Sequence, residues 1–511
     1  MRRLVRRGWC RFAQGLGQFL EATGSLVWHV ETTSYAETKI EGRPPRALRL
    51  SGSPAVGVYR SMSRSRNRPQ EVFVKRFVFA IAIAVASVVA AAFVATTSAT
   101  SPADPARRSA LDPRQAQDAH VSSQGRAVAD WSLIAQNAIV AVGRRFPGEA
   151  AVYMGIVHAT IYDVIVAIEG GYRPYAITPT ALPNASADAA VAAAAHRLLV
   201  GRFPDQQVNL DAVYLAYLDG IPDGEAETNG ILVGEEVGIR MLLLRANDGL
   251  DSIVPYVQPP PGPGFYEPTA PATPIGTRLP RVLPLALESA SRFRPNGPPA
   301  LSSGEYARDF NEVKDLGRFD SSVRSAEQTA LARFWTDSDT PQWNRNLLRL
   351  ADARGLTAIE TARMLAMAHV AGGDAMIGCF DAKYHYLSWR PLHAIHRADT
   401  DGNSLTAPDP TWQPLAPTPN HPEYPSAHAC HTTAIAEAVE SFFGPGRTSF
   451  SLDSLVTGET RYYDRFKDVV EEVNNARVWA GFHFRYADED GSKLGRKVAR
   501  FVVTNFFQPL D

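Results

Sequence analysis

The sequence predicts an all-α protein, built as a helical bundle with a long proline-rich crossover loop. The first observation is that apolar residues recur at helical spacing in most segments after residue 130. The second is that strands with clean period-two alternation are scarce. The third is that 13 of the 45 residues from Pro255 to Pro299 are proline, which excludes regular helix there. With 511 residues, 45% of them hydrophobic, the chain can bury a large core.

Four helices are predicted before the proline-rich loop 255–299. They cover residues 131–142, 150–168, 187–199 and 225–245. In the first, apolar side chains follow the i, i+3, i+4, i+7 spacing of one helix face, and Gly143 and Pro147 mark its end. The second is the most apolar of the four, and Ser186 is the predicted N-cap of the third.

Six further helices are predicted after the loop. They cover residues 325–335, 343–351, 357–377, 427–443, 462–481 and 495–507. The breaker Gly444-Pro445-Gly446 ends the fourth of these. No repeat of fixed period is present, so residues 104–511 are expected to form a single helical domain.

The N-terminal part of the chain is predicted to be a targeting segment and not part of the folded domain. Residues 77–96 are apolar and uncharged, directly follow Lys75 and Arg76, and precede small and polar residues. This pattern is typical of a secretory signal, with an uncleaved membrane anchor as the alternative. Residues 62–103 are therefore expected to be a signal peptide or anchor, and residues 1–61 a non-structural or mis-started extension. The protein is expected to be secreted, periplasmic or held at the cell surface.

The charge distribution excludes nucleic acid as a partner. The net charge is −1 for the whole chain but +10 for residues 1–76, which leaves −11 for the remainder. Residues 77–511 are too acidic to offer the basic surface that binds the phosphate backbone of a nucleic acid. No segment of residues 104–511 is expected to cross a membrane, so membrane contact would come only from residues 77–96. The two cysteines of this part, Cys379 and Cys430, could form a disulfide or remain a free buried pair.

Three short segments within residues 380–490 carry polar and charged residues in otherwise apolar helical surroundings. They are Phe380–Pro391, His421–His428 and Arg477–His483. Together they supply a lysine, two arginines, a serine and several histidines, an inventory that suits a tetrahedral oxyanion. Ser426 also precedes a predicted helix, whose N-terminal N–H groups and dipole favour an anion.

The spacing within and between these segments resembles the signature of a known superfamily. The chain carries K-x6-R-P, then P-S-A-H, then R-x5-H, beginning at Lys383, Pro425 and Arg477. This resembles the three-part motif of the type 2 phosphatidic acid phosphatase and vanadium-dependent haloperoxidase superfamily. The apolar helix 150–168 and the proline-rich middle look like the soluble haloperoxidase branch, so the likeness covers most of residues 104–511. It implies a helical bundle that holds vanadate, with phosphate able to occupy the same site.

The resemblance also implies a role for each matching residue. His483 would bond the central atom, as the ligand to vanadium or as the nucleophile on phosphorus. His428 would be the general acid/base on the opposite side. The oxyanion itself would be held by Lys383, Arg390, Ser426, the Ala427 N–H and Arg477. Lys383 would in addition polarise bound peroxide, which makes it catalytic together with the two histidines. Phe380 and His421 match positions that line the halide pocket in the family.

Two departures from the family pattern stand out. Ala427 replaces a glycine between the serine and the histidine, which keeps the N–H but adds a methyl group. The phosphatase form has an aspartate four residues after the last histidine, where this chain has Ala487, with Asp488 one place later. Asp488 is therefore an uncertain partner for His483, while Asp337 and Asp339 could orient either catalytic histidine.

The leading hypothesis is an enzyme that oxidises halide, bromide favoured, with hydrogen peroxide at a histidine-bound vanadate. An organic acceptor of the oxidised halogen and a homodimer are expected by analogy. The first alternative is an acid phosphatase of the same superfamily that works through a phosphohistidine. The second is a non-catalytic oxyanion-binding protein.

Overall fold

The computed structural model of the chain describes residues 125–180, 182–269 and 273–510. These residues lie in one compact unit. The predictions for residues 1–61 and 62–103, including the apolar stretch 77–96, lie outside the described residues.

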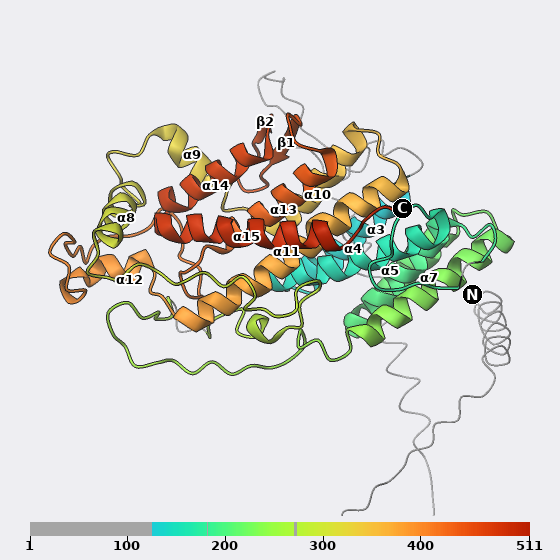
Figure 1. Ribbon diagram of the computed structural model, residues 1–511, viewed down its shortest axis with the longest axis horizontal. Coiled ribbons are helices and arrows are strands. Elements are labelled where there is room, and N and C mark those ends of the chain that lie inside the picture. Colours follow the sequence, from blue (N-terminus) through green and yellow to red (C-terminus); the bar gives the residue numbers. More distant parts are fainter. Residues whose placement is uncertain (1–124, 181, 270–272, 511) are drawn as a thin grey trace, which may run out of the picture. The chain divides into compact units, whose positions relative to one another are not determined.

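The N-terminal half of the described chain is a group of helices that Figure 1 shows in teal to green. It contains α3 (Arg126–Gln136), which continues as a π-helix (Asn137–Val142), α4 (Pro147–Glu169), α5 (Ala187–Arg202), a 3-10 turn (Pro204–Gln206), α6 (Gln207–Leu218) and α7 (Glu225–Leu244). The side chain of Ser186 accepts a hydrogen bond from the Ala189 N–H at 3.3 Å, which confirms it as the N-cap of α5. We call α3 to α7 the N-terminal bundle.

The predicted proline-rich connection follows α7. Within its described residues it holds only one short 3-10 turn (Leu279–Arg281). It is fixed to the core by Asp374, whose carboxylate accepts hydrogen bonds from the backbone N–H groups of Leu285, Ala286 and Leu287 at 2.6 to 2.8 Å. A buried carboxylate on a core helix therefore orders a stretch that cannot form secondary structure of its own.

The remaining residues form a second group of helices and one short hairpin. Its elements are α8 (Gly304–Leu316), α9 (Ala326–Phe334), α10 (Asp339–Ala353), α11 (Ala358–Tyr386), α12 (Pro391–His396), a 3-10 turn (Ala398–Thr400), α13 (Ala427–Phe443), β1 (Phe450–Asp453), β2 (Thr460–Tyr463), α14 (Phe466–Trp479) and α15 (Arg485–Asn505). The two strands are antiparallel, with Phe450 opposite Tyr463. We call α11, α13, α14 and α15 the C-terminal bundle.

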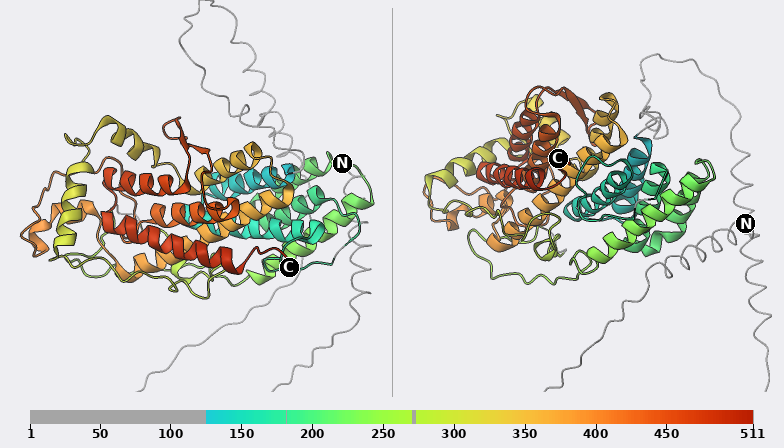
Figure 2. Two further views of the ribbon diagram at one scale, coloured as in Figure 1. Left: turned by 45° about the horizontal axis from the view of Figure 1, so that its top comes forward. Right: turned by 45° about the vertical axis from the view of Figure 1, so that its right-hand side comes forward.

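Helix α11 is the centre of the molecule. It packs against α4 on the side of the N-terminal bundle and against α13 and α15 on the other side, as Figures 1 and 2 show. A capping box of Thr357 and Glu360 starts it, and 22 of its 29 residues are buried. Because α11 is shared, its C-terminal turns carry the first motif directly into the C-terminal bundle.

Both bundles contain helix pairs in close contact through glycine. In the N-terminal bundle, a Cβ at Gly234 of α7 would overlap the carbonyl oxygen of Ala190 on α5. In the C-terminal bundle, a Cβ at Gly495 of α15 would overlap the carbonyl oxygen of Cys430 on α13. Backbones approach this closely only where no side chain intervenes, so these glycines set the spacing of the helices.

The predicted all-α class is confirmed, while several boundaries differ. Residues 462–463, predicted as helix, end strand β2, and α15 begins ten residues before the predicted start at residue 495. The short helices α6, α8 and α12 were not predicted. The expectation that no segment of residues 104–511 could span a membrane also needs correction. Helix α4 is long and apolar enough to do so, but it is almost entirely buried, because it is a core helix of the bundle.

Candidate oxyanion site

The three motif segments converge where α11, α13 and α14 end or begin. Helix α11 ends at Tyr386, and Leu387 follows with a left-handed φ of 50° that turns the chain away. Arg390 precedes the proline that begins α12, and Ser426 is the residue before α13. Arg477 lies on the last turn of α14, and His483 lies in the short link before α15. Helix ends thus bring the predicted residues into one region.

Lys383 is fully buried against the second motif segment. Its ammonium group donates hydrogen bonds to the carbonyl oxygens of Pro422 and Glu423, both at 2.9 Å, and to that of Pro425. Burial lowers the pKa of Lys383 to about 8, and the neighbouring Arg390 adds to this effect. The first motif is therefore held to the second through a cation that contacts only neutral acceptors.

Arg390 links all three segments. Its Nε donates to the carbonyl oxygen of His421 at 2.9 Å, and its Nη1 donates to that of Phe482 at 3.0 Å. Nη1 also lies 3.2 Å from Nε2 of His483, and Nη2 lies 3.0 Å from Nδ1 of His421. Because an arginine can only donate, Nε2 of His483 must be unprotonated in this contact, whereas Nδ1 of His421 also lies 3.1 Å from the carbonyl oxygen of Pro422, which can only accept.

His483 is held on its other side by a residue that the sequence did not point to. Its Nδ1 lies 3.0 Å from Oε1 of Glu423, which also accepts the backbone N–H of Phe484 at 3.1 Å. Burial, followed by the charges of Arg390 and Lys383, depresses the pKa of His483 well below its usual range. Glu423 is fully buried, and burial raises its pKa to about 8. The sequence signal that could have identified Glu423 was its place in the second motif segment, two residues after His421.

Arg477 and Ser426 are the remaining side chains predicted to bind the oxyanion. Arg477 donates to the carbonyl oxygen of Trp335 at 2.7 Å, while its Nε and the Ser426 hydroxyl have no hydrogen-bond partner among the described residues. Asp488 is fully buried nearby, and burial raises its pKa to about 7 against the opposing effects of Ser426 and the arginines. Asp488 therefore faces the serine and arginine side of the site, and Glu423 contacts His483 instead.

His428 lies on the first turn of α13, directly after Ala427. Its Nε2 lies 3.5 Å from the backbone carbonyl oxygen of Asp337. Burial lowers the pKa of His428 to about 3, Arg477 lowers it further, and Asp339 opposes the shift. The carboxylate of Asp339 contacts His431 at 3.2 Å, and that of Asp337 contacts Arg345 at 2.6 Å. Neither carboxylate makes a hydrogen bond to His428 among the described residues.

Phe380 and His421 lie together in an aromatic cluster. Their ring centroids are 5.2 Å apart, and Phe146, which sequence reasoning did not single out, lies 5.3 Å from Phe380 and 6.1 Å from His421. Phe146 precedes α4 and so brings the N-terminal bundle to the edge of the site. Both predicted halide-pocket residues therefore border an apolar wall beside Arg390.

The charges of the site are not balanced by ion pairs. Lys383, Arg390 and Arg477 are at most 2% exposed, and no carboxylate lies within 4 Å of any of them among the described residues. Burial lowers the pKa of both arginines to about 10, and the more distant carboxyl groups of Glu423 and Asp488 oppose this shift at Arg390 and Arg477 respectively. Buried cations without partners are costly, so this arrangement is suited to an anion that supplies the missing charge.

The residues present fit an oxyanion such as vanadate or phosphate. The donors are an ammonium, two guanidinium groups, an unpaired serine hydroxyl and the free N–H groups at the start of α13, where Ala427 is the first residue. His483 adds a nitrogen whose lone pair faces this side. The groups that vanadate or phosphate requires are therefore all present.

The other histidines and the cysteines make structural contacts. His158 and His369 stack within the core at 4.5 Å, as expected for buried histidines, and His396 contacts the carbonyl oxygen of Trp412. Cys379 and Cys430 are both buried and free. These residues take no part in the site as it is described above.

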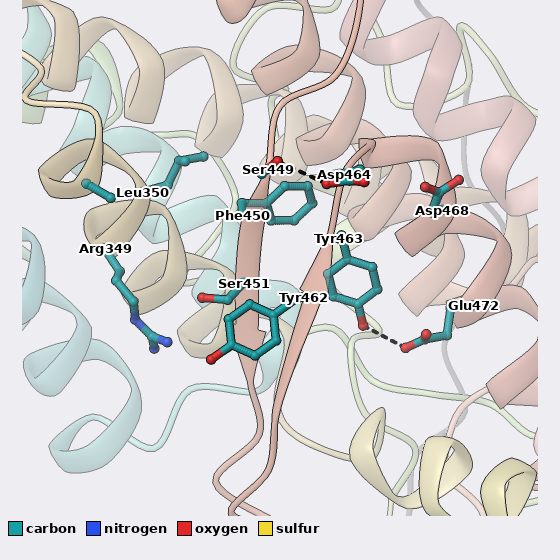
Figure 3. Close-up of a pocket in the computed structure, with 11 residues that line it drawn as sticks. Arg349, Leu350, Ser449, Phe450, Ser451, Tyr462, Tyr463, Asp464, Asp468 and Glu472 are labelled. Carbon is teal, nitrogen blue, oxygen red and sulfur yellow. Dashed lines mark hydrogen bonds between the residues drawn. The ribbon is translucent and has the colours of Figure 1, made fainter.

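A surface pocket of about 690 Å³ lies elsewhere, along the hairpin β1–β2 (Figure 3). Its carboxylates already have partners: Glu472 accepts from Tyr463 at 2.7 Å and Trp335 at 2.8 Å, and Asp468 pairs with Arg465. None of the predicted site residues lines it. The pocket therefore lacks the unbalanced charge that distinguishes the oxyanion site.

Comparison with known proteins agrees with the fold and with the motif-bearing region. Residues 363–511 match the family described as the VCPO second helical-bundle domain. The structure is similar to that of a bacterial vanadium-dependent iodoperoxidase, with a TM-score of 0.64, 24% identity, and coverage of 76% of this chain and 97% of the other. It is also similar to a holo-type bacterial vanadium-dependent chloroperoxidase, with a TM-score of 0.56, 16% identity, and coverage of 70% and 92%. No curated protein matches the chain.

Proposed function

Because the fold is that of the vanadium-dependent haloperoxidases, which supports the superfamily indicated by the motifs, we propose that the protein is a haloperoxidase of this kind. In this proposal it binds vanadate and uses hydrogen peroxide to oxidise halide. One observation carries the proposal: three buried cations without carboxylate partners surround an imidazole whose Nε2 is unprotonated. Such a site binds a tetrahedral oxyanion and presents a nitrogen to its central atom.

Each residue of the site has a defined task in this mechanism. Lys383, Arg390 and Arg477 neutralise the oxyanion, and the Ser426 hydroxyl and the Ala427 N–H bind its remaining oxygens. His483 would hold the central atom through Nε2, and His428 would give or take a proton at the bound group. Bound vanadate would supply a Lewis acid that activates peroxide toward attack by halide. In an empty site, burial keeps His428 neutral, so it is ready to accept a proton.

Bromide is the proposed halide. His421 occupies the position that is often histidine in brominating members of the family, and it lies beside Phe380 and Arg390. The two similar structures are described as an iodoperoxidase and a chloroperoxidase, so all three halides belong in the assay. An organic acceptor, a homodimer and export from the cell are further parts of the proposal.

The test is halide oxidation by the purified protein with hydrogen peroxide at mildly acidic pH, before and after loading with vanadate. We expect bromide oxidation that requires vanadate and is suppressed by phosphate, which competes for the same cations. His428→Ala should lower the rate by about 10²- to 10⁴-fold, the usual contribution of a general acid/base. Verified vanadate binding without oxidation of any halide would overturn the peroxidase proposal, and full activity of His428→Ala would overturn the site assignment.

A phosphatase is the second candidate, because the contact between His483 and Glu423 is also the arrangement of an activated nucleophile. A buried carboxyl group fixes the histidine, so the displaced Asp488 does not by itself exclude this chemistry. Hydrolysis of a phosphomonoester by the vanadate-free protein, abolished in His483→Ala, would favour the phosphatase. Retained phosphate binding without either activity would favour the non-catalytic alternative.

A further inference from the structure

The side chain of Glu423 joins two motif segments that are 60 residues apart in sequence. It lies between His421 and Ser426 in the second segment, while its Oε1 accepts hydrogen bonds from the Nδ1 of His483 and the N–H of Phe484 in the third. The backbone of the same residue contributes a carbonyl oxygen to Lys383 and an N–H to the Ser388 carbonyl oxygen. Glu423 is thus tied to all three segments and has no freedom to leave the site.

The hydrogen bonds on the two sides of the His483 ring determine its tautomer. On one side, Nη1 of Arg390 lies 3.2 Å from Nε2 and can only donate, so Nε2 must accept. On the other side, Oε1 of Glu423 already accepts an N–H from Phe484 and lies 3.0 Å from Nδ1. Nδ1 therefore carries the proton, and the lone pair of Nε2 points toward the cations.

We propose that Glu423 is the positioning residue that holds His483 in the Nδ1–H tautomer and thereby prepares Nε2 to bond the central atom of the oxyanion. This inference rests on the proposed function and names, for this chain, the carboxyl group that the shifted Asp488 fails to supply. Asp488 interacts with Ser426 and Arg477 and makes no hydrogen bond to His483 among the described residues. A carboxylate that fixes the tautomer and orientation of a metal-binding histidine commonly changes metal affinity by about 10- to 100-fold.

Three variants separate the hydrogen bond from the charge and from general packing. Glu423→Gln keeps an Oε1 acceptor for Nδ1–H and Phe484 but can no longer ionise. Glu423→Leu fills a similar volume without any acceptor. Asp488→Asn is the matched control, because it alters a second fully buried carboxylate of the same site that does not contact His483.

The first measurement is the tautomer of His483 in the vanadate-free protein, observed by ¹⁵N NMR of histidine-labelled full-length chain. The His483 signals are assigned by their loss in His483→Gln. We expect Nδ1–H in the wild type, in Glu423→Gln and in Asp488→Asn, and a shift toward Nε2–H in Glu423→Leu. An unchanged Nδ1–H tautomer in a folded Glu423→Leu protein would overturn the inference, and so would an Nε2–H tautomer in the wild type.

The second measurement is the affinity for vanadate and for inorganic phosphate by calorimetry. Vanadate bonds Nε2, while phosphate is held by the cations, so Glu423→Leu should weaken vanadate binding by about 10- to 100-fold. Phosphate binding should change far less, and Glu423→Gln should restore much of the vanadate affinity. Equal losses for both anions would indicate a merely structural role. Neither measurement uses peroxide or halide, so a protein without haloperoxidase activity would contradict the proposed function while the role of Glu423 was still decided.

Discussion

The two bundles differ in whether their buried positive charges are paired with carboxylates. At the end of α5, Arg202 is partly buried, and just after α7, Arg245 is buried; both pair with Asp248, at 2.9 and 3.1 Å. In the C-terminal bundle, Lys383, Arg390 and Arg477 are buried as deeply and contact only neutral acceptors and imidazoles. This difference indicates where a ligand binds. A cation that is paired with a carboxylate is already neutralised, whereas a buried cation without such a partner requires an external anion.

The same comparison holds for polar groups in general. Asp163 on α4 and Asp374 on α11 each accept three consecutive backbone N–H groups, so each is fully used in ordering a loop. In contrast, Ser426 and Nε of Arg477 have no partner among the described residues. At the meeting point of the three motifs this unfilled hydrogen-bonding capacity coincides with unpaired cations, so an anion bound there can satisfy both.

The largest expected effect comes from replacing one arginine without a carboxylate partner, Arg477, and one ion-paired arginine, Arg245, with methionine. Arg477→Met should weaken phosphate binding by about 10- to 100-fold, since a charge-assisted hydrogen bond contributes about 1.5–3 kcal/mol. It should change the free energy of unfolding of the anion-free protein little, because among the described residues Arg477 donates only to the Trp335 carbonyl oxygen. Arg245→Met should lose about 3 kcal/mol of stability, because it breaks a buried ion pair.

Chemical denaturation without phosphate, together with phosphate titration, measures both quantities for Arg477→Met and Arg245→Met. The comparison would be broken if Arg477→Met were as destabilising as Arg245→Met in the absence of anion. Such a result would mean that the cations of the C-terminal bundle serve the fold as much as those of the N-terminal bundle.

A smaller effect is expected from the glycines that allow close helix contact. Gly234→Ala and Gly495→Ala each place a methyl group against a backbone carbonyl oxygen, which should cost about 1–3 kcal/mol as overpacking. Only Gly495→Ala should also weaken phosphate binding, because α15 packs on α13, whose N-terminus begins the second motif. Thermal unfolding and calorimetry distinguish the two, and equal phosphate affinity in both variants would contradict the prediction.

The smallest expected effect is a difference in pH dependence between the two loop-binding aspartates. Burial raises the pKa of Asp163 to about 7 and that of Asp374 to about 6. Each raised pKa means that the folded state binds more protons than the unfolded state above pH 4, so stability falls as pH rises through the folded pKa. The contribution of Asp374 should be lost near pH 6 and that of Asp163 near pH 7.

Denaturant unfolding between pH 4 and pH 8 tests this order with Asp163→Asn and Asp374→Asn. Each variant should flatten the curve in its own range, by on the order of 1 kcal/mol, since one pKa unit corresponds to about 1.4 kcal/mol. A curve that keeps its full slope in both variants would show that other groups cause the pH dependence.

The sequence by itself determined the class of fold, the proline-rich connection and the residues that could hold an oxyanion. Helical spacing and N-caps such as Ser186 are local, so they can be recognised within one segment. The spacing of Lys383, Arg390, Arg477 and His483 is likewise fixed by their own helices and turns. Elements with few periodic residues, such as α6, α12 and strand β2, left too weak a signal for prediction.

Only the tertiary structure decided which residues meet. Glu423 and His483 are 60 positions apart, and Phe146 reaches Phe380 from the other bundle. Asp339 contacts His431, and among the described residues neither its carboxylate nor that of Asp337 makes a hydrogen bond to His428, although both were candidates to orient a catalytic histidine. The physical reason is that contacts between distant segments depend on how helices pack, and burial then decides which charges remain unpaired. A pattern along the chain records the local part of that information, while the long-range part arises only when the bundle closes around the site.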